Sequence, residues 1–168
     1  PWLGPLFSPQ PCHWRVKMAL TVKETRPVTP IRRAIATRLG ASYREAIHVP
    51  LFREVEVEGV LKARPRGSSQ GKGRPNLNDF ILKAVALALR AHPEFNARFE
   101  EGQHRLIEEV NLGLAIDTPK GLVVPVLRGV DTLSLVELSE ARRSHTEKAM
   151  AWKHTLADLA DGTFTISN

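Results

Sequence analysis

The chain has 168 residues, of which 42% are hydrophobic, and this composition is typical of one globular domain with a substantial core. No stretch approaches the run of about 18 apolar residues that spans a bilayer, so we expect no membrane partner. A single cysteine, Cys12, excludes an intrachain disulfide and fits a reducing compartment.

The N-terminal region is predicted to be an extended arm or linker over residues 1–28, followed by one domain over residues 29–168. Its four prolines among the first 11 residues, without an apolar segment, argue against a secretory signal. Thr29 and Pro30 combine an N-cap with a proline at the first helical position. They predict a helix over about residues 30–46.

An extended segment and a second helix follow. Val49, Leu51, Val55 and Val57 alternate with polar neighbours and predict a half-buried strand. His48, at the start of this strand, is expected to pack or to form a hydrogen bond. A short helical piece over 59–64 leads into a loop over 65–75 that is rich in Gly, Pro and Ser.

The next predicted helix covers residues 79–91, with Asn76 or Asn78 as its N-cap. His92-Pro93 ends it, because a residue before proline disfavours helical geometry. Its apolar side chains predict which face points inward. That predicted face consists of Phe80, Ile81, Ala84, Val85, Ala88 and Leu89.

The rest of the chain alternates strands and helices. Strands are predicted over 105–108, 110–116 and 122–127, with turns at Glu101-Gly102 and over 117–121. Ser134 is the predicted cap of a helix that runs to about Met150, and Thr155 starts one further helical turn. This order predicts an α/β fold with a mixed sheet.

The sequence ends in a predicted strand. Gly162 is followed by the β-branched and aromatic run Thr163-Phe164-Thr165-Ile166-Ser167-Asn168, which is typical of a buried strand. Because a buried strand needs partners on both sides, we expect part of the fold to lie outside these 168 residues.

Several active-site motifs are absent from the sequence. There is no G-x-S-x-G elbow, and the glycine-rich stretch over 67–72 is one residue short of a phosphate-binding loop. The six histidines show no metal-ligand spacing, so we expect no metal. His154 and Asp158 are interpreted as a helix-start pair on the surface.

Positive charge is concentrated in the first half of the chain. Residues 1–74 hold 14 Lys and Arg against 5 Asp and Glu, whereas residues 75–168 hold 10 against 13. This asymmetry favours either a nucleic acid or a phosphorylated ligand. Only Tyr43 and Phe52 are aromatic between Arg15 and Arg74, which leaves few platforms for bases, so we expect no nucleic acid.

Five blocks of the sequence carry a family resemblance. They are Arg32-Arg33-Ala34-Ile35-Ala36, the strand segment 48–57, Phe80-Ile81-Leu82-Lys83-Ala84, the stretch 111–127 around Asp117-Thr118-Pro119, and Gly162–Asn168 (G-T-F-T-I-S-N). In this order they resemble the dihydrolipoamide acyltransferase family, the E2 cores of 2-oxo acid dehydrogenase complexes, over about residues 27–168. One departure is Ile47, where the family usually has proline.

The resemblance implies a fold similar to chloramphenicol acetyltransferase: a two-layer mixed sheet with helices on one face, incomplete at the C-terminus here. It implies homotrimers that build a larger core, together with E1 and E3 components. The implied reaction moves an acyl group between dihydrolipoamide, carried on a separate lipoyl domain, and coenzyme A. The implied compartment is the cytoplasm, or the mitochondrial matrix in a eukaryote.

The resemblance also implies site residues. Ser167 corresponds to the serine whose hydroxyl stabilises the tetrahedral oxyanion, although a strand-end hydroxyl can equally bond to nearby backbone. The family's histidine base and its aspartate, in the motif H-x-x-x-D-G, have no counterpart in the sequence. The implied coenzyme A contacts are Arg64, Asn76, Asp117, Thr146, Ser167 and Asn168, although Asp117 can equally be an Asx-turn residue.

Two functions remain open at this point. The first is an acyltransferase core, whose chemistry this chain alone does not complete. The second is a truncated, inactive E2-like scaffold or partner-binding subunit, which the missing H-x-x-x-D-G motif favours. The acyl group that is transferred is not indicated by the sequence.

Overall fold

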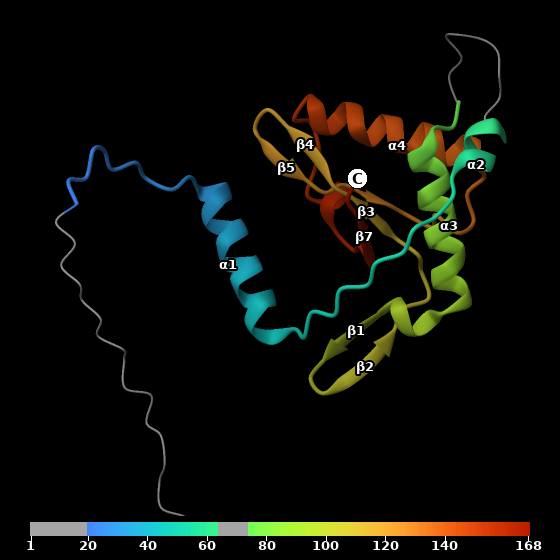
Figure 1. Ribbon diagram of the computed structural model, residues 1–168, viewed down its shortest axis with the longest axis horizontal. Helices are drawn as coiled ribbons and strands as arrows, with labels where there is room; N and C mark the ends of the chain where they lie inside the picture. The colour runs from blue at the N-terminus through green and yellow to red at the C-terminus, as the bar shows by residue number, and fades with distance from the viewer. Residues whose placement is uncertain (1–19, 64–73) are drawn as a thin grey trace, which may run out of the picture. The chain divides into compact units, whose positions relative to one another are not determined.

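The computed structural model describes residues 20–63 and 74–168 of the chain. The chain divides into two units, Pro1–Val49 and Pro50–Asn168 (Figure 1). Most of the predicted arm and nearly all of the predicted loop over 65–75 lie outside the described residues. No helix in the described ranges is long and apolar enough to cross a membrane.

The first unit contains helix α1 (Pro30–Glu45), which confirms the predicted helix. The hydroxyl of Thr29 accepts a hydrogen bond from the backbone N–H of Arg32 at 3.4 Å, and Pro30 occupies the first turn. The ring of His48 stacks on Tyr43 with centroids 4.9 Å apart, and its Nδ1 lies 3.1 Å from the carbonyl oxygen of Ala46. These contacts confirm the expectation for His48.

The predicted half-buried strand between Val49 and Val57 is wrong. This segment has no strand assignment, and the side chains of Leu51 and Phe52 are 89% and 93% exposed. A strand requires a neighbour for its backbone N–H and C=O groups. None of the described strands pairs with this segment, so its alternating pattern does not produce a ladder. Helix α2 (Glu58–Ala63) follows directly.

Helix α3 (Leu77–Ala91) begins two residues before the predicted start and is capped by Asn76. The Asn76 side chain accepts from the backbone N–H of Asp79 at 3.2 Å, and the Asp79 carboxylate accepts from the backbone N–H of Asn76 at 2.7 Å. This reciprocal pair is a capping box. A 3₁₀ turn, η1 (Pro93–Phe95), follows the helix, as the His92-Pro93 signal predicts.

The predicted inward face of α3 is partly wrong. The buried residues of the helix are Asp79, Leu82, Ala86 and Leu89. Ala84 and Ala88, which belong to the predicted face, are exposed. Apolar residues lie on both the buried and the exposed sides of the helix, for example Leu82 and Leu87, so periodicity alone does not select the buried side. Contacts with α4 and the sheet select it instead.

The described residues of the second unit form seven short strands. They are β1 (Ala97–Glu100), β2 (Gln103–Leu106), β3 (Leu112–Leu114), β4 (Ile116–Thr118), β5 (Gly121–Val123), β6 (Val126–Leu127) and β7 (Phe164–Ile166). The Glu101-Gly102 turn joins β1 to β2, with both residues at positive φ. The predicted strands over 110–116 and 122–127 are each divided in two, and Pro125, which has no N–H to donate, lies at the second break.

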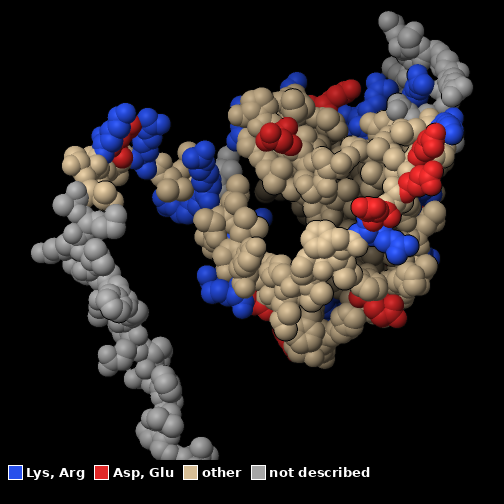
Figure 2. All heavy atoms as spheres, in the orientation of Figure 1, with Lys and Arg blue, Asp and Glu red and all other residues tan. Residues whose placement is uncertain are grey.

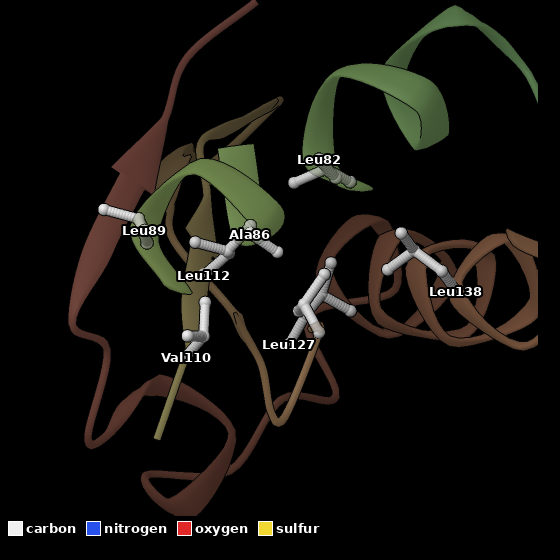
Figure 3. Packing of buried hydrophobic residues seen from close by; sticks show 8 residues of the cluster. Leu82, Ala86, Leu89, Val110, Leu112, Leu127 and Leu138 are labelled. Carbon is white, nitrogen blue, oxygen red and sulfur yellow. The ribbon is translucent and has the colours of Figure 1, made fainter. Parts of the chain in front are cut away.

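The central sheet is mixed and has the order β6-β3-β7. Strand β3 runs antiparallel to β6 and parallel to β7. Helix α3 packs on this sheet together with α4 (Leu135–Met150), which Ser134 caps as predicted. Figure 3 shows Leu82, Ala86 and Leu89 of α3 and Leu138 of α4 gathered around the strand residues. This cluster is the core, and it confirms the α/β class.

The predicted burial of the last strand is wrong. Strand β7 is an edge of the described sheet, with Phe164 38% exposed, Thr165 exposed and Ile166 half-buried. Its contact with β3 is nevertheless close, because a Cβ added at Gly113 would lie 3.2 Å from the Thr165 hydroxyl oxygen. Before β7, the 3₁₀ turn η2 (Ala157–Leu159) confirms the helical turn predicted at Thr155.

Candidate functional site

The predicted site residues are distributed over several elements of the second unit. Asn76 caps α3, Asp117 lies in β4 and Thr146 lies on α4. Ser167 and Asn168 follow β7, and both are exposed. Arg64 lies outside the described residues.

Asn168 and the start of α3 are brought together by a side-chain hydrogen bond. The amide group of Asn168 donates to the side-chain oxygen of Asn78, which lies two residues after Asn76. The end of β7 therefore lies beside the first turn of α3. Two predicted coenzyme A contacts, Asn76 and Asn168, come into one region of the fold through this bond.

A buried ion pair holds α3 against α4. The Nε of Arg142 lies 2.6 Å from Oδ1 of Asp79, and its Nη2 lies 3.3 Å from Oδ2. The Asp79 side chain is fully buried and that of Arg142 is 12% exposed. Thr146 follows one turn later, and its hydroxyl donates to the carbonyl of Arg142 at 2.8 Å. The ion pair therefore holds α4, which contains Thr146, against α3, which Asn76 caps.

Asp117 lies in a strand rather than on a helix. Strand β4, which contains it, packs against α4 and pairs with β5. Its side chain is exposed. The structure shows no contact that joins Asp117 to Asn76 or Asn168 within the described ranges, so these predicted contacts do not form one compact cluster.

Ser167 is positioned by the pairing of β7 with β3. The register places Leu114 opposite Ile166, and the backbone N–H of Ala115 donates to the carbonyl of Ile166 at 2.9 Å. The main chain is thus fixed up to the residue before Ser167. The serine then follows the ordered strand, with its side chain exposed.

Asn111 is a positioning residue that the sequence reasoning missed. Its side-chain amide donates to the carbonyl of Asp161 at 3.1 Å, and its Oδ1 accepts from the backbone N–H of Gly129 at 3.0 Å. Its backbone exchanges hydrogen bonds with Thr163. These bonds attach the start of β7 to β3. A polar amide at the beginning of an apolar run was the one available signal.

Lys83 was also missed. Its ammonium donates to the carbonyls of Asp131 and Leu133, at 2.8 and 2.6 Å, and so fixes the loop that precedes α4. A lysine inside an amphipathic helix ordinarily indicates a solvated position. Here the long side chain reaches backbone acceptors instead.

Titratable groups gather where α4 ends. The carboxylate of Asp158 accepts from the N–H and hydroxyl of Thr155, which lowers the pKa of Asp158. Burial lowers the pKa of His145, with Lys148 acting in the same direction and Asp158 against them. The interpretation of His154 as a surface residue is partly wrong, because its half-buried ring lies edge-on to Trp152 at 4.9 Å.

We expect the stability of the fold to decrease below about pH 6.5, the ordinary pKa of histidine. Because the pKa of His145 is lowered in the folded state, the unfolded chain binds more protons there, and stability rises with pH up to that value. Asp158 is ionised in both states over this interval and adds no slope. Urea unfolding of wild type and His145→Gln between pH 5 and 8 measures this, and an equal slope in both would contradict it.

Two observations concern the ligands that the chain could bind: the basic residues of the first unit, and the groups that could hold a metal ion. In the described part of the first unit the basic residues are Lys23, Arg26, Arg32, Arg33, Arg38 and Arg44. Blue Lys and Arg atoms gather on the visible face of this unit in Figure 2. Among the described residues there is no group of three or more His, Cys, Asp or Glu that could hold a metal ion.

Residues 21–168 match the family model of the 2-oxoacid dehydrogenases acyltransferase (catalytic domain). The dihydrolipoyllysine-residue acetyltransferase component of the mitochondrial pyruvate dehydrogenase complex of Dictyostelium discoideum is 35% identical over 142 residues, covering 84% of this chain and 22% of that protein. The corresponding succinyltransferase component of the 2-oxoglutarate dehydrogenase complex of Haemophilus influenzae is 33% identical, covering 84% and 36%. The chain thus spans well under half of these relatives.

Solved structures give the same result for the fold. A probable dihydrolipoamide acetyltransferase from Listeria monocytogenes superimposes with a TM-score of 0.81 at 26% identity, covering 86% of this chain and 64% of that one. The dihydrolipoamide acetyltransferase of Azotobacter vinelandii gives a TM-score of 0.79 at 28% identity, covering 99% and 67%. In the latter, a serine, a histidine and an asparagine have been investigated for their role in the catalytic mechanism.

Proposed function

Because the chain belongs to the family of 2-oxoacid dehydrogenases acyltransferase catalytic domains, we propose that it takes part in acyl transfer between dihydrolipoamide and coenzyme A. The observation that carries this proposal is the family match over residues 21–168, which includes G-T-F-T-I-S-N on β7. The acyl group stays open, since the relatives include acetyl- and succinyltransferase components.

The chemistry requires a base and an oxyanion donor. A thiol with a pKa of about 8.5 is mostly protonated at neutral pH, so a base must remove its proton for attack on the thioester carbonyl. The attack forms a carbon–sulfur bond and gives a tetrahedral intermediate with a negatively charged oxygen. Collapse of this intermediate breaks the original carbon–sulfur bond. The departing thiolate recovers the proton, and no covalent intermediate with the protein is needed.

We propose Ser167 as the oxyanion donor. Its support is its place in the T-I-S-N run, directly after the residue whose carbonyl is bound by Ala115. A hydroxyl donor is effective when its position is fixed before the charge develops. The bonds from Asn111 and Ala115 at the two ends of β3 supply that fixation.

In this proposal the base that removes the thiol proton is not one of residues 1–168. The arrangement is that of an active site to which two subunits contribute residues. The sequence holds no H-x-x-x-D-G, and the nearest candidate pair departs from it because Leu159 follows Asp158. The carboxylate of Asp158 is moreover engaged by Thr155. Asp158 therefore serves the local turn.

The proposed coenzyme A contacts retain some of their bonding capacity. The Asn76 side-chain oxygen is used in the cap of α3, so its amide N–H groups are the part offered to a ligand. The Thr146 hydroxyl proton is used by Arg142, which leaves its oxygen as an acceptor. Asp117 is exposed, and Arg64 stays a prediction from the sequence.

The proposed partners are further copies of this chain in a homotrimer and larger core, a lipoyl domain, and E1 and E3 components. One solved relative with a TM-score of 0.74, at 27% identity, is the cubic core of a pyruvate dehydrogenase multienzyme complex. The proposed compartment is the cytoplasm or, in a eukaryote, the mitochondrial matrix, and the Dictyostelium relative is mitochondrial. The division proposed from the sequence, an extended arm or linker over 1–28 and the N-terminal portion of a catalytic domain over 29–168, stays a proposal.

A second candidate function is an inactive scaffold with the same fold. The observation that favours it is the lack of H-x-x-x-D-G in the 168 residues. This candidate predicts assembly with partner proteins but neither coenzyme A binding nor acyl transfer.

Titration calorimetry with coenzyme A tests the proposed function. We expect saturable binding of coenzyme A by the wild-type chain, with one site per chain. The control variant Glu94→Gln, which changes an exposed residue, should bind coenzyme A with the same affinity. A folded protein that releases no heat with coenzyme A would contradict the proposal and favour the scaffold.

A further inference from the structure

Trp152 has a backbone conformation that its residue type rarely adopts. Helix α4 ends in a Schellman motif, in which the backbone N–H of Trp152 donates to the carbonyl of Ala149 at 3.0 Å and that of Lys153 to the carbonyl of Lys148 at 2.8 Å. Trp152 has φ 56°, in the left-handed region, where glycine is the usual residue. The turn itself therefore does not require an indole, and an outlier of this kind points to a role for the side chain.

The indole is held between two segments of the chain. The ammonium of Lys120 lies 5.5 Å from the ring centroid, and the ring of His154 meets it edge-on, with centroids 4.9 Å apart. Trp152 is half-buried and Lys120 is exposed. The indole is thus a fixed aromatic surface with a cation beside it.

The β4–β5 turn that carries Lys120 is ordered by its own hydrogen bonds. The Thr118 hydroxyl donates to the carbonyl of Gly121 at 2.6 Å and accepts from the backbone N–H of Lys120 at 3.3 Å. The hairpin lies beside the C-terminal end of α4 (Figure 1), and β4 packs against that helix. The approach of Lys120 to the indole therefore follows from the packing of two ordered elements.

The surroundings of the indole select an anionic ligand with a flat ring. Lys148 and Lys153 lie at the same helix end as Trp152, and both are exposed, although Lys148 also lies 3.8 Å from Asp158. Lysines favour phosphate, and an indole favours the π-face of a base. Among common ligands, a nucleotide combines the two.

We propose that Trp152 and Lys120 bind the adenosine 3′-phosphate part of coenzyme A, with the adenine stacked on the indole and the ammonium on a phosphate. This inference rests on the proposed function, which supplies coenzyme A as the ligand. Two of the proposed contacts lie close in the chain: Asp117 is in the same hairpin as Lys120, and Thr146 is on the helix that ends at Trp152.

Stacking of a base is compatible with the contact that Lys120 already makes. An exposed ammonium over an aromatic ring is a weak interaction, whereas base stacking contributes more to binding. Lysine also has a flexible stem of four carbons, so the displaced ammonium stays near the ring. The adenine can therefore replace the ammonium over the ring, while the ammonium moves to the phosphate.

The test is titration of coenzyme A, 3′-dephospho-coenzyme A and pantetheine against wild type, Trp152→Gly and Trp152→Phe. We expect Trp152→Gly to weaken coenzyme A binding by about tenfold, the usual scale for loss of a stacked base. Trp152→Phe should restore most of the affinity. Pantetheine, which has no nucleotide, should bind wild type and Trp152→Gly equally.

Glycine is well suited to the backbone at this position, which has φ 56°, so we expect Trp152→Gly to fold. Intrinsic fluorescence provides a second readout, since the chain has three tryptophans and Trp2→Phe with Trp14→Phe leaves Trp152 alone. Coenzyme A should quench this signal. Equal affinity of wild type and Trp152→Gly for coenzyme A would overturn the inference and leave the proposed function intact, whereas no binding by wild type would overturn both.

Discussion

Replacement of Arg142 by methionine is expected to lower the free energy of unfolding by about 3–5 kcal/mol, the usual effect of breaking a buried ion pair. The change leaves the carboxylate of Asp79 fully buried without its cation. One hydrogen bond to that carboxylate remains, from the backbone N–H of Asn76 at 2.7 Å. Urea unfolding followed by far-ultraviolet circular dichroism measures the loss.

Two further variants separate the burial of charge from general damage. Arg98→Met removes an exposed arginine that lies 4.0 Å from Glu100, and it should change stability by less than about 1 kcal/mol. The double variant Asp79→Leu with Arg142→Met removes both charges and should recover much of the loss. If Arg142→Met were as mild as Arg98→Met, the ion pair would not hold α3 to α4.

Ser167→Ala is expected to lower the rate of acyl transfer by about 10²–10³-fold, the scale observed when one oxyanion donor is removed. The KM for acetyl-CoA should stay the same, because the hydroxyl acts on charge that develops only in the transition state. The rate is to be measured from acetyl-CoA to dihydrolipoamide with added imidazole, which supplies a base in place of the absent H-x-x-x-D-G histidine.

Ser144→Ala is the matched control, since Ser144 is an exposed serine on α4. It should leave the imidazole-dependent rate unchanged. If Ser167→Ala and Ser144→Ala had equal rates, the role of Ser167 would be that of an ordinary strand-end residue. A rise in KM without a change in kcat would instead place Ser167 in ground-state binding.

Helix positions could be predicted from the sequence because their signals are local. Thr29, Asn76 and Ser134 each precede an amphipathic run, and each caps the helix that follows. A cap acts within four residues of chain, so its effect is visible in the sequence. The Glu101-Gly102 turn was predictable for the same reason.

Strands were predicted less well because pairing is not local. The segment before α2 has the alternation of a strand but no described partner, and β7 has a buried-strand sequence but lies at a sheet edge. Alternation indicates which side chains could share one face of a strand, but it does not indicate which other strand pairs with it. The same limit explains why one predicted strand became β3 and β4.

The candidate site was likewise predicted only in part from the sequence. The G-T-F-T-I-S-N run identified Ser167 as a candidate from residues that are adjacent in the chain. The groups that position it were not predicted, because Asn111 bonds to Asp161 and Gly129, and Arg142 bonds to Asp79, across large sequence separations. Such contacts are set by how the elements pack, and a single sequence does not show them.

The most direct test of the central claim is acetyl transfer from acetyl-CoA to dihydrolipoamide by the wild-type chain, measured with and without imidazole. We expect no turnover without imidazole, and with imidazole a rate that saturates with acetyl-CoA and exceeds the protein-free reaction. A folded protein whose rate with imidazole equals the protein-free rate, with succinyl-CoA as well as with acetyl-CoA, would contradict the proposed function.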